Sequence, residues 1–179
     1  MPEPAPAPDA LQLRLHVYPD PVLLRTAQPV TEFDDDLRAR VARMFEIMYA
    51  EKGVGLAGPQ AGWMQRVLVL NPSGDPDDAA GARCVINPRI LKKWGKETDQ
   101  EGCLSFPGIF VDVERAKGLA LAWSDEHGET HEADWNDFPA RILQHEHDHL
   151  DGVLLVHRMS PVDRIRYRRE LEDLVAEAG

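Results

Sequence analysis

The segment ILQHEHDHLDG carries two histidines and a glutamate at the spacing of a metal clamp. His145 and His149 stand four residues apart, so on a helix both imidazoles project from one face and can share an ion. Glu146 lies beside that face, where its carboxylate could take a proton from a water molecule that the ion activates. Apolar Ile142 and Leu143 precede the clamp and favour a buried site. The motif predicts metal binding, although the same spacing can arise by chance.

A catalytic metal site needs a third protein ligand and one open position for water. The protease extension of the motif would supply a histidine where this chain has Leu155. Cys103, in QEGCLSFPG, is the stronger candidate, because the glycines and proline around it predict a tightly shaped backbone of the kind found where a ligand approaches closely. An acidic ligand further downstream stays open. Cys84 lies in an apolar, strand-like run and is expected to be inert core.

The hydrophobic pattern predicts the elements that must position these residues. Apolar residues recur at helical spacing over 31–52, a second helix over 137–150 carries the two histidines, and Ser160-Pro161-Val162-Asp163 is typical of the start of a last helix. Four runs read as strands: RVLVLN, ARCVINPRI, KGLALAWS and THEADW. Strands that follow one another without intervening helices favour antiparallel pairing. We therefore expect an α+β fold, with antiparallel β-sheets packed around a central helix carrying HExxH, an N-terminal helix and a C-terminal helix.

Length and composition bound the class of protein. A chain of 179 residues fits one domain, and we expect residues 1–10 to be a flexible N-terminal extension and 11–179 a single catalytic domain. The formal net charge of -11 argues against DNA and anionic membranes as partners. No apolar run is long enough to span a membrane and the first residues resemble no signal peptide, so a cytoplasmic location with reduced thiols is expected.

The glycine-rich run GVGLAGPQAG at 53–62 is the third notable segment. It lacks the lysine and hydroxyl residue that a phosphate-binding loop requires. By itself the run indicates only unusual dihedral angles or a close approach of the backbone to another group.

Taken in order, GVGLAGPQ, EGCLS and QHEHDHLDG resemble the three signature segments of the peptide deformylase family. The resemblance extends from about His16 to the last helix. It implies a metal-dependent hydrolase that removes the N-terminal formyl group from formyl-methionyl peptides of newly made proteins and releases formate.

The resemblance also implies roles for particular residues. One divalent ion, commonly Fe2+ with Zn2+, Ni2+ or Co2+ as substitutes, would be held by Cys103, His145 and His149. Glu146 would be the general acid and base, while the side-chain amide of Gln60 and the backbone N–H of Leu104 would stabilise the oxyanion. Four residues would contact the substrate: Val54, Gly55, Phe138 and Ile142.

The same resemblance implies that Glu101 and Arg115 form a buried pair supporting the Cys103 loop. Two departures from the family pattern stand out. Gly58 occupies a position where the family usually has alanine, a small change with no lost chemistry. The stretch GIFVDVER after Pro107 also differs, which could alter how residues beyond the formyl-methionine are held.

Other charged residues receive weaker interpretations. His147 and Asp148 are expected to point away from the clamp into solvent. Four arginines on the last helix could dock on ribosomal RNA, as in some family members, although a solvated helix face is the simpler interpretation. They are Arg164, Arg166, Arg168 and Arg169.

Two further hypotheses stay open at this point. A zinc peptidase would cleave internal amide bonds instead of releasing formate. A module that binds metal or peptide without turnover would have no need of Glu146 and Gln60. Sequence fixes neither the physiological metal nor the oligomeric state, because sulfur and imidazole ligands accept several divalent ions.

Overall fold

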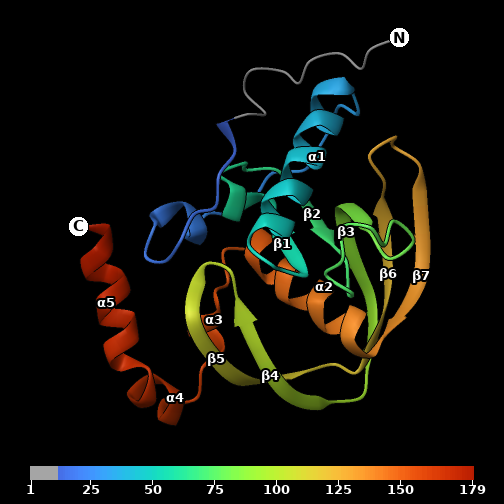
Figure 1. Cartoon of the computed structure of the whole chain (residues 1–179). Coiled ribbons are helices and arrows are strands. Elements are labelled where there is room, and N and C mark those ends of the chain that lie inside the picture. Colours follow the sequence, from blue (N-terminus) through green and yellow to red (C-terminus); the bar gives the residue numbers. More distant parts are fainter. Residues whose placement is uncertain (1–11) are drawn as a thin grey trace.

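The computed structural model describes residues 12–179, so the expected extension at 1–10 lies outside the described residues (Figure 1). The strands are β1 (Gly55–Ala57), β2 (Val67–Leu70), β3 (Arg83–Trp94), β4 (Glu97–Cys103), β5 (Phe106–Arg115), β6 (Gly118–Ser124) and β7 (Thr130–Asn136). The α-helices are α1 (Asp35–Ala50), α2 (Asp137–Leu150), α3 (Leu155–Arg158), α4 (Pro161–Arg166) and α5 (Arg168–Ala178). Two 3-10 turns, η2 (Pro21–Leu24) and η3 (Gly58–Ala61), complete the described elements.

The strands form two antiparallel sheets, which confirms the predicted α+β class. Five strands pair in the order β1-β2-β3-β6-β7, and β4 pairs with β5 in a separate two-stranded sheet. Helix α2 contacts β1, β2, β6 and β7 of the larger sheet. The helix that carries the His-Glu-x-x-His motif is therefore central, as predicted (Figure 1).

Strand β2 shows how both faces of the larger sheet are covered. Val67 and Val69 pack into a cluster with residues of α1, whereas Leu68 and Leu70 pack into a second cluster with residues of α2. Successive side chains of a strand point to opposite faces, so a strand buried on both sides is apolar throughout. The run VLVL is fully buried for that reason.

Helix α1 begins later than the periodicity of residues 31–52 predicts. Asp34 stands at the N-cap, and its side chain accepts a hydrogen bond from the backbone N–H of Leu37 at 2.9 Å. Asp35 and Asp36 follow in the first turn, where negative charge is favourable. The three aspartates thus fix the start of the helix.

The sequence analysis did not identify β1, β4 and β5. Strand β4 reads ETDQEGC, which has almost no apolar residues, because most of its side chains are exposed. In β5, Ile109, Val111 and Val113 alternate with exposed residues as in a half-buried strand, but Pro107 and Gly108 obscure the pattern. This two-stranded sheet brings Cys103 to the site.

The C-terminal segment forms two helices where one was predicted. Ser160 caps α4 as expected, since its side chain accepts from the backbone N–H of Asp163. The chain leaves helical geometry at Tyr167, whose hydroxyl donates to the carbonyl of Phe110 on β5 at 2.7 Å. That hydrogen bond ties the C-terminal helices to the smaller sheet.

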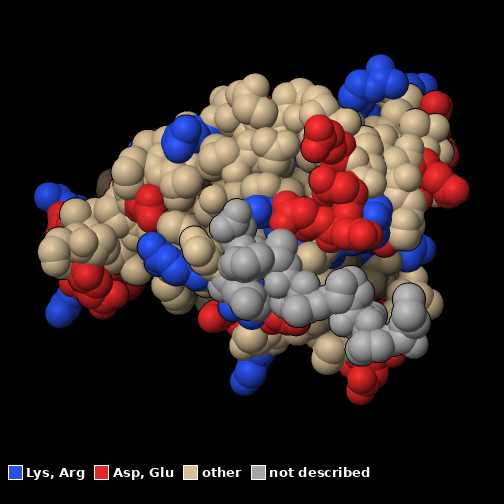
Figure 2. Space-filling model, turned by 90° about the horizontal axis from the view of Figure 1, so that it is seen from above, with Lys and Arg blue, Asp and Glu red and all other residues tan. Residues whose placement is uncertain are grey.

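Acidic residues outnumber basic ones in this chain, 31 to 20. On the face shown in Figure 2, acidic side chains form a cluster to the right of the middle, and basic side chains are scattered across the face and along its edges. Among residues 12–179, no helix combines the length and the apolar character that a membrane span would need.

Gly58 begins the turn that leads to Gln60, and we predict that it is required for the stability of this chain. A Cβ atom there would lie 2.6 Å from the carbonyl oxygens of Trp63 and Gln65. Gly58→Ala should therefore lower the free energy of unfolding by about 1 to 3 kcal/mol, because backbone must move to admit the methyl group. Urea unfolding measures this, and an unchanged midpoint would show that the 63–65 turn moves outward without cost.

Candidate metal and catalytic site

Helix α2 presents the two histidines of the motif on one buried face. The rings of His145 and His149 lie 5.1 Å apart between centroids. Both residues are buried, and so is Glu146 between them in sequence. The four-residue spacing therefore produces the clamp that the sequence predicts.

Cys103 reaches this clamp from the end of β4. Its Sγ atom lies 3.4 Å from Nε2 of His149, and the possible ligand atoms of Cys103, His145 and His149 all lie within 4.8 Å of one another. A register shift between Gly102 and Cys103 interrupts the pairing of β4 with β5 at this point. The fold thus brings the three proposed ligands together from a strand and a helix that are distant in sequence.

The donor set fits a divalent metal ion of borderline softness. Thiolate and imidazole ligands at ordinary metal–ligand distances stand roughly 3.6 Å apart in tetrahedral coordination, close to the 3.4 Å between Cys103 and His149. Oε2 of Glu146 is buried and has no hydrogen-bond partner among the described atoms. Buried polar atoms are nearly always paired. An unpaired carboxylate oxygen beside this donor set suits a site that takes a water molecule.

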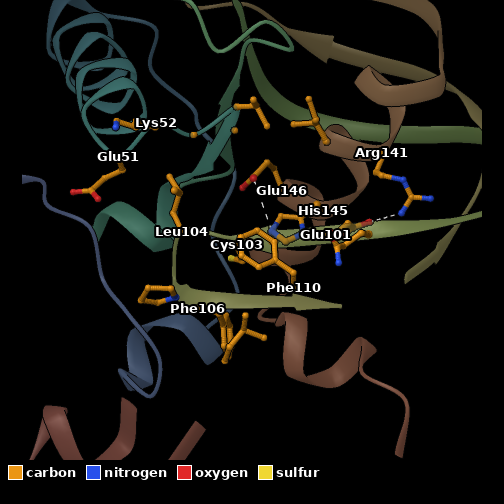
Figure 3. A pocket seen from close by; sticks show the side chains of 18 of the residues that line it. Glu51, Lys52, Glu101, Cys103, Leu104, Phe106, Phe110, Arg141, His145 and Glu146 are labelled. Atoms are coloured by element: carbon orange, nitrogen blue, oxygen red, sulfur yellow. Dashed lines mark hydrogen bonds and ion pairs between the residues drawn. The ribbon is translucent and has the colours of Figure 1, made fainter. Parts of the chain in front are cut away.

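Glu101 orients the ring of His145 through the ring nitrogen that does not face the cavity. Its Oε1 accepts from Nδ1 of His145 at 2.9 Å, which leaves Nε2 of the ring free to face the cavity. Arg115 donates to both carboxylate oxygens, at 2.7 and 2.8 Å, and Arg141 adds a bond of 2.6 Å. The predicted Glu101–Arg115 pair is present and buried. Figure 3 shows Arg141 and Glu101 joined beside His145.

Charge around the histidines alters several pKa values. Burial alone would raise the pKa of Glu101, but hydrogen bonds from Arg115 and His145 lower it to about 2, so this carboxylate stays ionised. Burial would lower the pKa of His145, yet Cys103 and Glu101 outweigh it and raise the pKa well above its usual value. The pKa of His149 is held well below its usual value by burial and by the neighbouring His145. A proton and a metal ion thus compete for the same nitrogen of His145.

Glu146 sits where proton transfer would be needed. Its Oε1 lies 4.0 Å from Nε2 of His145, and the two side chains face one another in Figure 3. Burial raises the pKa of Glu146 to about 7, which suits a group that must both accept and return a proton near neutral pH. A Cβ atom on Gly55 would lie 2.7 Å from Oε1 of Glu146. Glycine at position 55 therefore leaves room for this carboxylate.

Gln60 is fixed beside Cys103 by its neighbours. Its Oε1 accepts from the backbone N–H of Ala57 at 2.9 Å, which directs Nε2 toward Oγ of Ser105 at 3.1 Å and Sγ of Cys103 at 3.6 Å. The side chain is buried, and its NH2 group lies between Ser105 and Cys103. Sequence reasoning did not single out Ser105, whose hydroxyl links Gln60 to the carbonyl of His16.

A cavity of about 600 Å3 opens in front of these groups. Such a volume suits a ligand the size of a short peptide terminus. Its walls include all four residues expected to contact substrate together with the rim residues Glu51, Lys52 and Phe110. The four are Val54, Gly55, Phe138 and Ile142. Leu104 also lines the cavity next to Cys103 (Figure 3).

The structure corrects the interpretation of the two residues between the histidines. Asp148 is not solvent-exposed: its side chain is 15% exposed and binds Arg115 at 2.9 Å and Arg158 at 2.8 Å. His147 is half-buried and lies near Asp151. Helical geometry does direct both away from the clamp, but Arg115 of β5 and Arg158 of α3 cover that side of α2.

Arg141 was missed although the sequence carries a signal for it. It stands four residues before His145, hence on the same buried face of α2, and an arginine there requires partners. It donates to Glu101, to the carbonyl of Val113 and to the carbonyl of Glu97. Arg141 thereby joins α2 to both strands of the smaller sheet.

Known proteins share this chain's sequence and fold. The family model for polypeptide deformylase matches residues 12–165. The chain belongs to the polypeptide deformylase family.

A peptide deformylase of Thermotoga sp. (strain RQ2) is 45% identical over 162 residues, which are 90% of this chain and 95% of the relative. The solved structure of peptide deformylase from Plasmodium falciparum has a TM-score of 0.89 and 39% identity, covering 92% of this chain and 96% of that chain. The solved structure of peptide deformylase from Thermotoga maritima has a TM-score of 0.78 and 44% identity, covering 84% of this chain and 99% of that chain.

Family membership confirms the resemblance found in the sequence. As a deformylase, the chain is a hydrolase that removes the N-terminal formyl group from nascent peptides. The family is one of metalloenzymes, and Cys103, His145 and His149 form a possible metal site in this chain.

The two cysteines should differ in reactivity. Cys103 is partly accessible at the cavity, whereas Cys84 is buried and burial raises the pKa of its thiol far above the usual value. An alkylating reagent should modify one thiol in metal-free folded protein, none once Zn2+ is bound, and both after unfolding. Peptide mass mapping identifies the site. Equal modification of Cys103 with and without Zn2+ would argue against its role as a ligand.

Proposed function

We propose that Cys103, His145 and His149 hold one divalent ion and that Glu146 moves the proton when the chain hydrolyses the formyl group of formyl-methionyl peptides. The observation that carries this proposal is the convergence of the three ligand atoms within 4.8 Å beside a buried carboxylate. When bound there, a divalent ion would supply Lewis acidity and lower the pKa of a coordinated water molecule. The remaining chemistry falls to side chains and backbone of this chain.

Glu146 is placed to act as general base and then as general acid. Its buried carboxylate accepts a proton from the attacking water molecule, whose oxygen forms a bond to the formyl carbon. When the carbon–nitrogen bond breaks, Glu146 returns the proton to the departing amine, and formate and a free N-terminus result. Its unpaired Oε2 atom supports this role, because one oxygen is available for the water molecule.

Gln60 and the backbone N–H of Leu104 stabilise the negative charge that develops on the formyl oxygen. Ala57 fixes the Gln60 amide so that its NH2 group faces Cys103, and Leu104 follows Cys103 directly. Donors fixed in advance lower the barrier because no reorganisation is needed when the charge appears. Both donors thus flank the proposed ligand.

The cavity accounts for recognition of the methionyl end. Ile142 and Phe138 stand about one and two turns before His145 on α2 and supply an apolar wall for the methionine side chain. Val54 and Gly55 line the same cavity, and the absence of a side chain at Gly55 lets the substrate backbone approach Glu146. Substrate lies between β1 and α2 in this arrangement.

The finer assignments belong to the same proposal. We infer that Fe2+ is the physiological ion, with Zn2+, Ni2+ or Co2+ as substitutes, that residues 11–179 work as one catalytic domain, and that the protein is cytoplasmic. Thiolate and imidazole ligands suit each of these ions. Anaerobic purification with metal analysis tests the first assignment, and protein that is isolated active with another divalent ion in place of iron from cells supplied with iron would refute it.

We also propose that the C-terminal helices dock on the ribosome. The support for docking is the basic cluster on α4 and α5 in a chain of net charge -11. Within the cluster, Arg164 donates to the carbonyl of Val156 and Arg168 pairs with Glu172, so part of it is already engaged. Cosedimentation with ribosomes that survives charge reversal of these arginines would remove the proposal.

Formate release tests the role of Glu146. The Zn2+- or Fe2+-loaded protein should release formate from formyl-Met peptides, and Glu146→Ala should lower kcat by about a thousandfold while retaining the metal, because general acid–base catalysis contributes that much. Glu46→Gln, an exposed carboxamide on α1, is the control and should keep full activity. Cleavage of internal amide bonds without formate would favour a peptidase instead, and an active Glu146→Ala enzyme would refute the assigned role.

Gln60→Glu tests the oxyanion donor with little change of shape. A carboxylate at position 60 can still accept from the backbone N–H of Ala57, but it removes the NH2 donor. We expect kcat to fall by about a hundredfold or more at saturating metal, with KM changed far less. Single-turnover formate release measures the step directly. Wild-type kcat in this variant would leave Leu104 as the sole donor.

A further inference from the structure

A continuous chain of ionic contacts leads from His145 to the surface on the side of α2 away from the substrate cavity. Glu101 joins His145 to Arg115 through hydrogen bonds of 2.7 to 2.9 Å. Nη1 of Arg115 then donates to Oδ2 of Asp148 at 2.9 Å. Arg158 closes the chain with two bonds to Asp148, from Nε at 3.0 Å and from Nη2 at 2.8 Å.

Exposure rises along this chain. The side chains of Arg115, Asp148 and Arg158 are 5%, 15% and 44% exposed. Asp148 and Arg158 both line a second cavity of about 350 Å3, which is large enough to hold water. Arg158 therefore stands between Asp148 and the solvent of this cavity.

The two bonds from Arg158 fix the orientation of Asp148. A bidentate guanidinium–carboxylate pair restricts both side chains more than a single hydrogen bond does. Without Arg158, Asp148 would meet water in the second cavity, which would screen its attraction for Arg115 and let its carboxylate rotate. Arg115 would then hold Glu101 less firmly, although Arg141 would still hold it from the other side.

We propose that Arg158 is a positioning residue for the metal centre: it acts through Asp148, Arg115 and Glu101 on the orientation of the His145 ring. It lies outside the substrate cavity and touches none of the proposed metal ligands. The inference rests on the proposed role of His145 as a ligand. It extends the set of supporting residues to α3.

A stabilising surface ion pair would behave differently. A half-exposed ion pair contributes little to the stability of the fold, so its loss should leave metal affinity unchanged. Partners that orient a metal-bound histidine directly change metal affinity or activity by about 10- to 100-fold. Three residues separate Arg158 from His145 in the chain of contacts, so we expect a smaller change in metal affinity, about 3- to 10-fold.

Zn2+ affinity of the metal-free protein tests the inference without substrate. Arg158→Ala should weaken Zn2+ binding about 3- to 10-fold in competition with a chelator, and at saturating Zn2+ should lower kcat several-fold with KM within about twofold. Arg158→Lys, which keeps one charged hydrogen bond and the fold, should recover part of both losses. The control Arg43→Ala breaks an arginine–glutamate pair on α1 and should match wild type.

Two results would overturn the inference. One is wild-type Zn2+ affinity and kcat in Arg158→Ala. The other is an effect on thermal stability alone, with the Zn2+ affinities of Arg158→Ala and Arg158→Lys equal to that of the control Arg43→Ala. Since Zn2+ affinity is measured without turnover, a wild-type protein that bound Zn2+ but released no formate would contradict the proposed function and leave this inference standing.

Discussion

The buried carboxylate of Glu101 is the interaction on which the site depends. It accepts from Arg115, Arg141 and His145, which come from a different strand and from the central helix. An isolated buried charge costs several kcal/mol, so the carboxylate is stable there only while these partners surround it. Because Glu101 precedes Cys103 by two residues, the contacts that stabilise it also place the thiol against α2.

The same carboxylate determines how His145 can bind an ion. With Nδ1 donating to Glu101, the lone pair of Nε2 faces the cavity, which is the tautomer a ligand needs. His149 lacks such a partner, since its Nδ1 atom has none among the described atoms. The two histidines of one motif are therefore held unequally, and the ring on the Glu101 side is the one whose orientation the protein fixes.

The sequence predicted those parts of the site that depend on local spacing. The period of a helix alone placed His145 and His149 on one face, and glycine-rich signatures connected Cys103 and Gln60 to them. The sequence did not predict contacts that join different elements of the fold: Arg158 of α3 binds Asp148, and Arg141 of α2 binds Glu101. No local pattern encodes such pairings. Strand β4 was missed for a related reason, because an exposed strand needs no apolar alternation.

The smaller sheet explains why the supporting charges are needed at all. Among the described strands, β4 and β5 pair only with each other, and a two-stranded sheet is marginally stable alone. One face of β5 packs on the C-terminal helices, through Ile109 and its neighbours. Strand β4 is instead joined to α2 by polar contacts: Glu101, two residues before Cys103, binds Arg141 and His145, and Arg141 also donates to the carbonyls of Glu97 and Val113. A thiolate and two imidazoles must be placed to within a few tenths of an ångström to share one ion. Apolar packing alone brings groups close together, whereas directional hydrogen bonds also fix their distances and angles.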